Sequence, residues 1–117
     1  MRKARILAFC LLLAPGAAAA ADGGGQYTAI GAAGVVSCEA WLLPANESNG
    51  VKDQLRNWLA GYLTAYNRHA FAGRNIAAGY APDRLLSWAD RFCQNNLSAT
   101  MAALADSLIV ELERNRR

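Results

Sequence analysis

Two cysteines, Cys38 and Cys93, limit how this chain can fold more than any other feature. They follow a leader typical of exported chains, so we expect them in an oxidising compartment, where two cysteines allow a single intramolecular pairing. The difference between their positions, 93 minus 38, is 55 residues. Closing so long a loop in the unfolded chain is worth roughly 4 kcal/mol, a large share of the ~5–15 kcal/mol that stabilises a typical domain. We therefore expect a structural disulfide.

Other roles for these cysteines stay open from the residues alone. An intermolecular disulfide is one alternative, and a metal-binding or catalytic thiol is another. Zinc takes four nitrogen or sulfur ligands, but the chain has no Cys-x-x-Cys motif, and His69 has no partner at ligand spacing. A catalytic thiolate needs a nearby base, which His69 would supply only by a coincidence of folding.

Residues 1–21 have the three parts of a signal peptide. A basic start precedes a short apolar run and then a stretch of small residues that a signal peptidase accepts. The apolar run is too short for a transmembrane helix, which needs roughly 20 residues. We expect cleavage after Ala20 or Ala21, giving a periplasmic or secreted protein with no stable membrane insertion. A retained anchor or a lipid on Cys10 is the alternative, and bulky Phe9 argues against the lipid.

Charge gives little support to nucleic-acid binding. The whole chain carries 12 basic and 9 acidic residues. Cleavage would remove Arg2, Lys3 and Arg5 and no acid, so nine residues of each sign would remain. The apparent basicity therefore belongs to the leader. We interpret the remaining basic cluster, within 114–117, as a solvated helix end rather than a phosphate or lipid site.

The glycine- and alanine-rich segment 22–35 lacks helical periodicity, which predicts a flexible arm leading into a domain at 36–117. A short helix is expected over residues 38–43, and Pro44 would end it. The segment from Pro44 to Gly50 is rich in turn-forming residues and is expected to form a turn.

The strongest helical signal begins at Val51. Apolar residues recur there with the spacing of one buried stripe, i, i+3, i+4 and i+7. They are Leu55, Trp58, Leu59, Tyr62, Leu63 and Tyr66. Gly61 costs about 1 kcal/mol against alanine inside a helix, which suggests that another helix approaches closely there. The aromatic residues could line a ligand groove, but core packing is the simpler interpretation in a domain this small.

A connector at 72–83, with Gly73 and Gly79 suited to turns, precedes the next helix. Pro82 favours the first helical position, and Asp83 favours the positive end of the helix. The apolar side chains of this helix form a stripe that places Cys93 at the edge of a buried face. The stripe is Leu85, Trp88, Ala89 and Phe92.

The last helix carries a wide apolar stripe between Met101 and Leu112, and Ser98 is expected to cap its start. The pattern as a whole predicts an all-α fold. It is a small single-domain helical bundle of three main helices plus a short N-terminal helix, with one disulfide.

The residues offer no recognisable catalytic constellation. A hydrolytic triad needs histidine, and His69 is the one histidine in the chain. The acids are scattered over helix ends and outer faces, where solubility explains them: Asp83, Asp90, Asp106, Glu111 and Glu113. We therefore expect a protein that is not an enzyme and that takes neither a cofactor nor a metal.

Three stretches resemble the HdeA/HdeB family of small periplasmic acid-stress chaperones: "SCEAWL", "WLAGYLTAYN" and "LLSWADRFCQNNLSATMAALADSLIVEL". The resemblance implies a compact disulfide-bonded helical protein, dimeric in the best-known members, that loosens at low pH and holds unfolded clients. On this resemblance Cys38 and Cys93 form the disulfide, and a homodimer is an option. The apolar side chains that would bind the client are Trp58, Tyr62, Tyr66, Trp88 and Leu108.

The same helix pattern also resembles small periplasmic immunity proteins that neutralise secreted cell-wall-degrading toxins. That resemblance implies a dedicated protein partner instead of unfolded clients. A third option is another exported binding module. Genomic neighbourhood and a client-aggregation assay would separate these classes.

Overall fold

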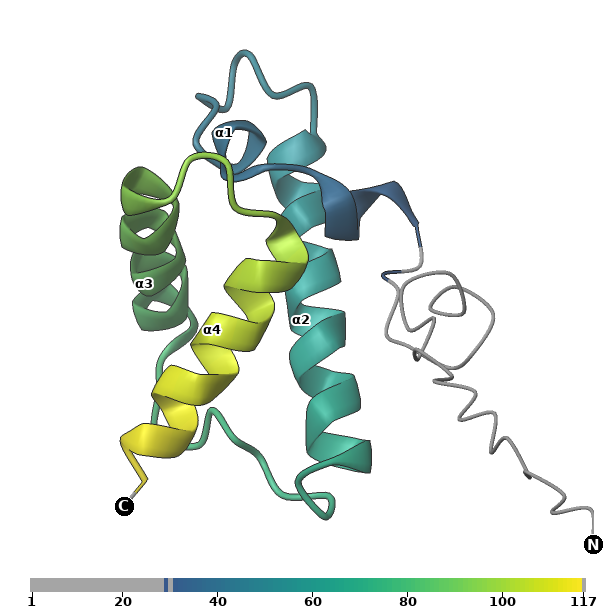
Figure 1. Ribbon diagram of the computed structural model, residues 1–117, viewed down its shortest axis with the longest axis vertical. Coiled ribbons are helices and arrows are strands. Elements are labelled where there is room, and N and C mark those ends of the chain that lie inside the picture. The colour runs from purple at the N-terminus through teal and green to yellow at the C-terminus, as the bar shows by residue number, and fades with distance from the viewer. Residues whose placement is uncertain (1–28, 30, 117) are drawn as a thin grey trace, which may run out of the picture.

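The computed structural model describes residues 29 and 31–116, which contain four α-helices, one short 3-10 helix and no β-strand (Figure 1). The expected signal peptide lies outside these residues. The elements are η1 (Ala32–Val35), α1 (Cys38–Trp41), α2 (Val51–His69), α3 (Pro82–Asn95) and α4 (Met101–Arg114). The all-α prediction of three main helices and a short leading helix is confirmed.

The core is built around α4, which packs against both α2 and α3 while α1 lies across one end of the bundle (Figure 1). The wide apolar stripe predicted for this helix is buried, and its inward-facing residues recur at intervals of three and four. Its buried residues are Met101, Leu104, Ala105, Leu108, Ile109 and Leu112. From α2 the core receives Leu55, Leu59 and Leu63, and the loop before α3 contributes Ile76.

The helix α1 is held by three kinds of contact. A disulfide joins Cys38 to Cys93 of α3, and both cysteines are fully buried. The indole nitrogen of buried Trp41 donates a 2.7 Å hydrogen bond to a carboxylate oxygen of Asp90. The Cys38 amide also donates to the carbonyl of Ala99, at 2.8 Å. Because a helix this short is unstable alone, these contacts hold it in place.

The start of α4 differs from the prediction in its capping residue. Thr100, and not Ser98, is the N-cap: its hydroxyl accepts a 3.2 Å hydrogen bond from the Ala103 amide. Thr100 has the extended backbone conformation that an N-cap requires, with φ −80° and ψ 162°. Ser98 lies two residues earlier, inside a turn.

The last residues of the expected arm, 22–35, have secondary structure. Residues 32–35 form η1, which packs on α2 and α4. Gly34 is buried there against the Trp58 ring. A methyl group at Gly34 would lie 2.9 Å from a carbon of that ring and 2.4 Å from the side chain of Ala29. The glycine therefore permits a close approach that sequence periodicity does not reveal.

Gly61 is not the close-approach position that was predicted. No atom of another described element lies within 4 Å of where its methyl group would sit, and the residue is exposed. The outer side of α2 at this point faces solvent, so the glycine only weakens the helix.

Replacing Gly61 and replacing Gly34 with alanine are therefore expected to change the free energy of unfolding in opposite directions. Gly61→Ala is expected to raise the free energy of unfolding by up to about 1 kcal/mol, because alanine favours a helix interior. Gly34→Ala, the matched control, is expected to lower it, because the new methyl group clashes with Trp58. Urea unfolding followed by circular dichroism measures both. Equal destabilisation by the two substitutions would contradict an open environment at Gly61.

Candidate functional site

The side chains predicted to bind a client divide between two surfaces. Trp58, Tyr62 and Tyr66 lie half-buried along α2, and the last two reach α4. Trp88 and Leu108 lie together in a cleft between α3 and α4. The first surface, here named the α2/α4 seam, consists of Trp58, Tyr62 and Tyr66 with Asp106 and Glu113. The second, the α3/α4 groove, consists of this cleft and of a neighbouring hollow lined by Trp88, Phe92 and Val110.

Two hydrogen bonds close the seam. The Tyr62 hydroxyl donates to Asp106 at 2.5 Å, and the Tyr66 hydroxyl donates to Glu113. The hydrogen bond to Glu113 raises the pKa of Tyr66 above its ordinary value of 10.0, and burial of the phenol and the charge of Glu113 add to the effect. The phenol therefore stays protonated at neutral pH and keeps its donor. Hydrogen bonds to ionised acceptors are stronger than those between neutral groups, so both contacts favour charged carboxylates.

The seam is also aromatic. The Trp58 and Tyr62 rings lie 5.3 Å apart between centroids, and those of Tyr66 and Phe71 lie 6.0 Å apart. All four side chains are only partly buried against the core. Separation of α2 from α4 would expose a row of ring faces that is covered in the closed bundle.

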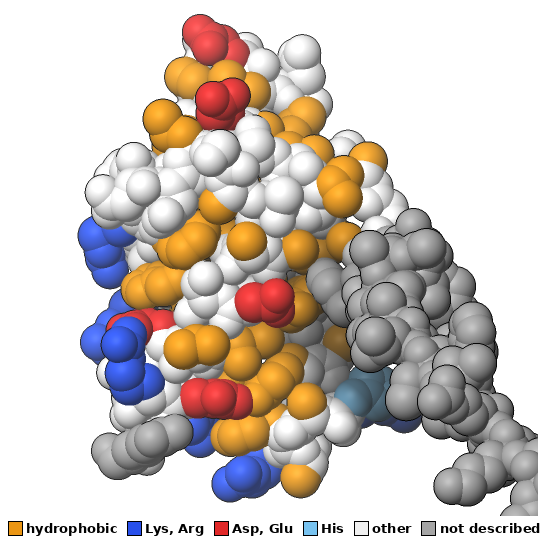
Figure 2. All heavy atoms as spheres, in the orientation of Figure 1, with side chains coloured by type: hydrophobic (Ala, Val, Ile, Leu, Met, Phe, Trp, Pro, Cys, Tyr) orange, Lys and Arg blue, Asp and Glu red, His pale blue; other side chains and the backbone are white. Residues whose placement is uncertain are grey.

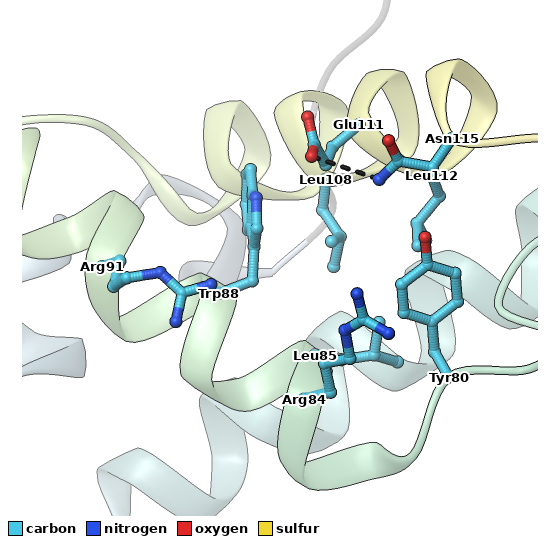
Figure 3. A pocket seen from close by; sticks show the side chains of 9 residues that line it. All are labelled: Tyr80, Arg84, Leu85, Trp88, Arg91, Leu108, Glu111, Leu112 and Asn115. Carbon is cyan, nitrogen blue, oxygen red and sulfur yellow. Dashed lines mark hydrogen bonds between the residues drawn. The ribbon is translucent and has the colours of Figure 1, made fainter.

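The deepest part of the α3/α4 groove is a cleft of about 110 Å³ (Figure 3). Its floor is apolar: Leu85 comes from α3, and Leu108 and Leu112 come from α4. The rings of Tyr80 and Trp88 stand at its two ends (Figure 3). Leu108 is only 1% exposed, so it belongs to the core and touches the cleft with one side.

Polar side chains form the rim of this cleft: Arg84, Arg91, Glu111 and Asn115. Figure 3 shows Arg84 reaching into the space between Tyr80 and Trp88, with Glu111 on the opposite helix. The Arg84 guanidinium lies 4.8 Å from the centre of the Tyr80 ring, a cation–π distance. The rim therefore combines two cations with one carboxylate.

The carboxylate of Glu111 is already engaged. It forms an ion pair with Arg114 and accepts a 3.2 Å hydrogen bond from Asn115. These hydrogen bonds, from Arg114 first and Asn115 second, hold the pKa of Glu111 below its ordinary value of 4.5. Among residues 31–116, no carboxylate lies within ion-pair distance of Arg84 or Arg91. The unneutralised charge at the rim is therefore positive.

The groove continues past Trp88 into a second hollow of about 360 Å³. Trp88 and Phe92 stack there with centroids 5.4 Å apart, and Val110 is 62% exposed. Figure 2 shows hydrophobic side chains distributed across the face that carries α4, with basic side chains along the edge on the α3 side. The α3/α4 groove thus presents apolar surface beside positive charge.

Three of the five acids whose presence was explained by solubility also have specific partners on another helix. Asp90 accepts from Trp41, Asp106 from Tyr62 and Glu113 from Tyr66. Each bond joins two different helices, so these carboxylates hold the bundle together. The sequence did not reveal these partners because they lie 44 to 49 residues away along the chain.

The C-terminal basic cluster is exposed to solvent as predicted, and in the part of the chain that the structure describes it also makes specific contacts. Arg116 donates hydrogen bonds to the carbonyls of Asn75 and Ile76, and its guanidinium lies 4.9 Å from the Phe71 ring. Arg114 pairs with Glu111. These contacts attach the chain end to the loop between α2 and α3.

His69 is exposed at the last position of α2. Across residues 31–116, no three histidine, cysteine, aspartate or glutamate side chains are grouped closely enough to share a metal ion. In the same range, no helix combines the length and the hydropathy needed to cross a membrane.

Sequence reasoning did not single out Tyr80, Arg84 and Arg91 as candidates for binding. A signal was present, because Arg84 and Arg91 are seven residues apart and therefore share a face of α3 with the apolar residues between them. What the helix pattern could not show is that α4 closes the other side of this face.

Comparisons of the chain with family models, with curated proteins and with solved structures found no match. The structure itself defines a class, a small all-α domain with one buried disulfide. Its two candidate surfaces are the α2/α4 seam and the α3/α4 groove.

Proposed function

We propose that this protein is an exported chaperone that holds unfolded clients in acid, using the aromatic side chains of the α2/α4 seam. The observation that carries the proposal is the pair of tyrosine–carboxylate hydrogen bonds that close the seam. The resemblance to the HdeA/HdeB family supports the same function. A cleaved signal peptide and a periplasmic location belong to the proposal.

Acid would weaken the seam in two ways. At low pH, where carboxylates as a class are protonated, hydrogen bonds to charged acceptors are replaced with weaker neutral ones. At about pH 3 most carboxylates are protonated, so the mature chain would carry nine Lys and Arg charges plus His69 with little negative charge to balance them. The resulting self-repulsion favours an opened bundle.

Glu111 also makes the folded protein less stable as the pH falls. Its pKa is lower in the folded protein than in the unfolded chain, so its contribution to stability is present above 4.5. That contribution is lost as the pH falls from 4.5 through the lowered pKa that Glu111 has in the folded protein. The disulfide does not titrate, so α1 would stay joined to α3 while α2 and α4 separate.

The test is a client assay with a seam variant. Tyr62→Phe with Tyr66→Phe removes both donors, each worth less than about 1 kcal/mol at so exposed a site. We expect wild-type protein to suppress light scattering by an aggregating periplasmic extract at about pH 3, where carboxylates are protonated. The double variant is expected to begin suppression at a higher pH than the wild type.

Tyr80→Phe is the matched control, because Tyr80 is a half-buried tyrosine outside the seam. It is expected to leave the pH of onset unchanged. Absence of suppression by an equimolar dose of wild-type protein in acid would overturn the chaperone proposal. An unchanged onset in the double variant would show that the seam does not control opening.

The alternative from the sequence, an inhibitor or immunity protein with one dedicated partner, has one observation in its favour. The α3/α4 groove is open in the closed bundle and needs no acid to form. A dedicated partner would use such a preformed surface.

A further inference from the structure

We propose that the α3/α4 groove is a docking site for an acidic segment of another protein. The segment would place one apolar side chain between Trp88 and the leucine floor, beside the Arg84 guanidinium, and set its carboxylates against Arg84 and Arg91 (Figure 3). This inference goes beyond the chaperone proposal, because it concerns the closed bundle at neutral pH and a different surface.

The size of the cleft favours a side chain over a free small molecule. Pockets for metabolites and drug-sized ligands measure roughly 300–1,000 Å³, whereas this cleft measures about 110 Å³. An apolar cavity of about 150 Å³ accommodates a group as large as benzene. The cleft therefore suits a single leucine- or ring-sized group, which is how an anchor residue of a protein partner enters its pocket.

The walls of the cleft have the composition of an interface centre. Trp, Tyr and Arg are the residues that most often dominate binding energy at protein interfaces. Here Trp88, Tyr80 and Arg84 surround a floor of buried leucines. The second hollow, with Phe92 and exposed Val110, extends this apolar surface along the same two helices, so an extended or helical segment would find contacts beyond its anchor residue.

Charge determines which partner fits. Arg84 and Arg91 both line the cleft, and seven residues of helix separate them by about 10 Å. Glu111, the acid on the opposite rim, is neutralised by Arg114. In the second hollow Asp106 keeps its charge, because the Tyr62 hydroxyl that donates to it is neutral, so the excess positive charge is at the cleft with Arg84 and Arg91. An acidic segment would therefore meet two arginines without carboxylate partners, whereas a basic segment would meet repulsion.

The Arg84 side chain is also positioned before a partner arrives. Its guanidinium packs on the Tyr80 ring, which limits its rotamers and reduces the entropy lost on binding. Arginine binds carboxylates through two parallel hydrogen bonds, so a fixed guanidinium selects carboxylates over other acceptors.

The experiment titrates the mature, disulfide-bonded protein at neutral pH with a synthetic peptide that has one phenylalanine between two pairs of glutamates. Nitrogen-15 NMR shifts report where the peptide binds. We expect shifts confined to the residues that line the groove. Arg84→Gln with Arg91→Gln is expected to weaken binding by about tenfold for each arginine, because a tenfold change in affinity is about 1.4 kcal/mol, close to the contribution of one charged hydrogen bond.

Arg56→Gln with Arg68→Gln is the matched control, since it removes the same charge from α2, outside the groove. It is expected to leave binding unchanged. Replacing the phenylalanine of the peptide with alanine is expected to abolish the groove shifts.

Four outcomes would overturn the proposal. The first two are an absence of NMR shifts at millimolar peptide and shifts elsewhere on the surface. The third is equal binding of a peptide that has lysine in place of glutamate. The fourth is a change in the groove signals with protein concentration when no peptide is present. The last would assign the groove to a second copy of the chain. None of them bears on client holding in acid, which the seam variant tests separately.

Discussion

Replacing both cysteines, Cys38→Ser with Cys93→Ser, is expected to lower the free energy of unfolding by about 4 kcal/mol. The disulfide closes a loop of 55 residues that contains the whole of α2 and most of α3. Without it the unfolded chain gains the conformations that the loop had excluded. Since small domains are stabilised by only ~5–15 kcal/mol, this loss removes a large part of the total.

Urea unfolding followed by circular dichroism measures the loss, and wild-type protein treated with a reductant is the control. The reduced wild type and the double variant are expected to unfold at the same urea concentration, well below that of the oxidised protein. Equal urea midpoints for the oxidised protein and the double variant would contradict a stabilising role for the disulfide. Intact-mass analysis of exported protein tests whether the bond forms there, because two free thiols add two hydrogens.

The loss is expected to be concentrated at α1. This four-residue helix has the disulfide, the Trp41–Asp90 hydrogen bond and a backbone bond from Cys38 as its attachments. Trp41 is fully buried, so release of α1 would expose the indole. A red shift of tryptophan fluorescence at low urea, before helix content falls, is the signature of α1 detaching first.

The helices were predictable because their signals are local. Pro82 is compatible only with the first turn, and α3 begins there. The apolar spacing from Leu55 to Leu63 has the helical period, and those leucines are buried in α2. The pairing of Cys38 with Cys93 followed because two cysteines allow one bond within the chain. Each inference used a few neighbouring residues or simple counting.

The cross-helix contacts were not predictable because their signals are not local. Asp90 and Asp106 look alike in sequence, yet one accepts from an indole of α1 and the other from a phenol of α2. Gly34 and Gly61 each follow an alanine in the sequence, yet Gly34 alone of the two lies against an aromatic ring. Which residue lies opposite depends on how the helices are arranged, and periodicity does not fix that arrangement.

The candidate site shows the same division. The aromatic stripe of α2 was predicted, and Trp58, Tyr62 and Tyr66 are half-buried in the structure. The α3/α4 groove was not predicted, because it forms only when α3, with Arg84 and Arg91, packs against Leu108 of α4. Composition could not separate a core role of Leu108 from a role in binding, and the structure places Leu108 both in the core and on the floor of the groove.

Leu108→Ala is expected to lower the free energy of unfolding by about 2–5 kcal/mol, because the leucine is 1% exposed and alanine would leave a cavity. In a domain of this size that loss lowers the melting temperature by at least about 10 °C. Val110→Ala is the matched control on the same helix, since Val110 is 62% exposed, and it is expected to change stability by less than about 0.5 kcal/mol. Thermal unfolding measures both, and similar small effects would contradict the core position of Leu108.

Leu108→Met separates the two roles of this residue. The volume-conserving change is expected to cost less than about 1.5 kcal/mol, so the bundle stays folded. It nevertheless alters the floor on which an anchor side chain would rest, because Leu108 lines the cleft between Tyr80 and Trp88. If the groove binds an acidic segment, the variant is expected to change the affinity of the glutamate peptide, while Leu97→Ala, at an exposed leucine outside the groove, leaves it unchanged. A folded Leu108→Met protein with unchanged affinity would show that Leu108 only stabilises the core.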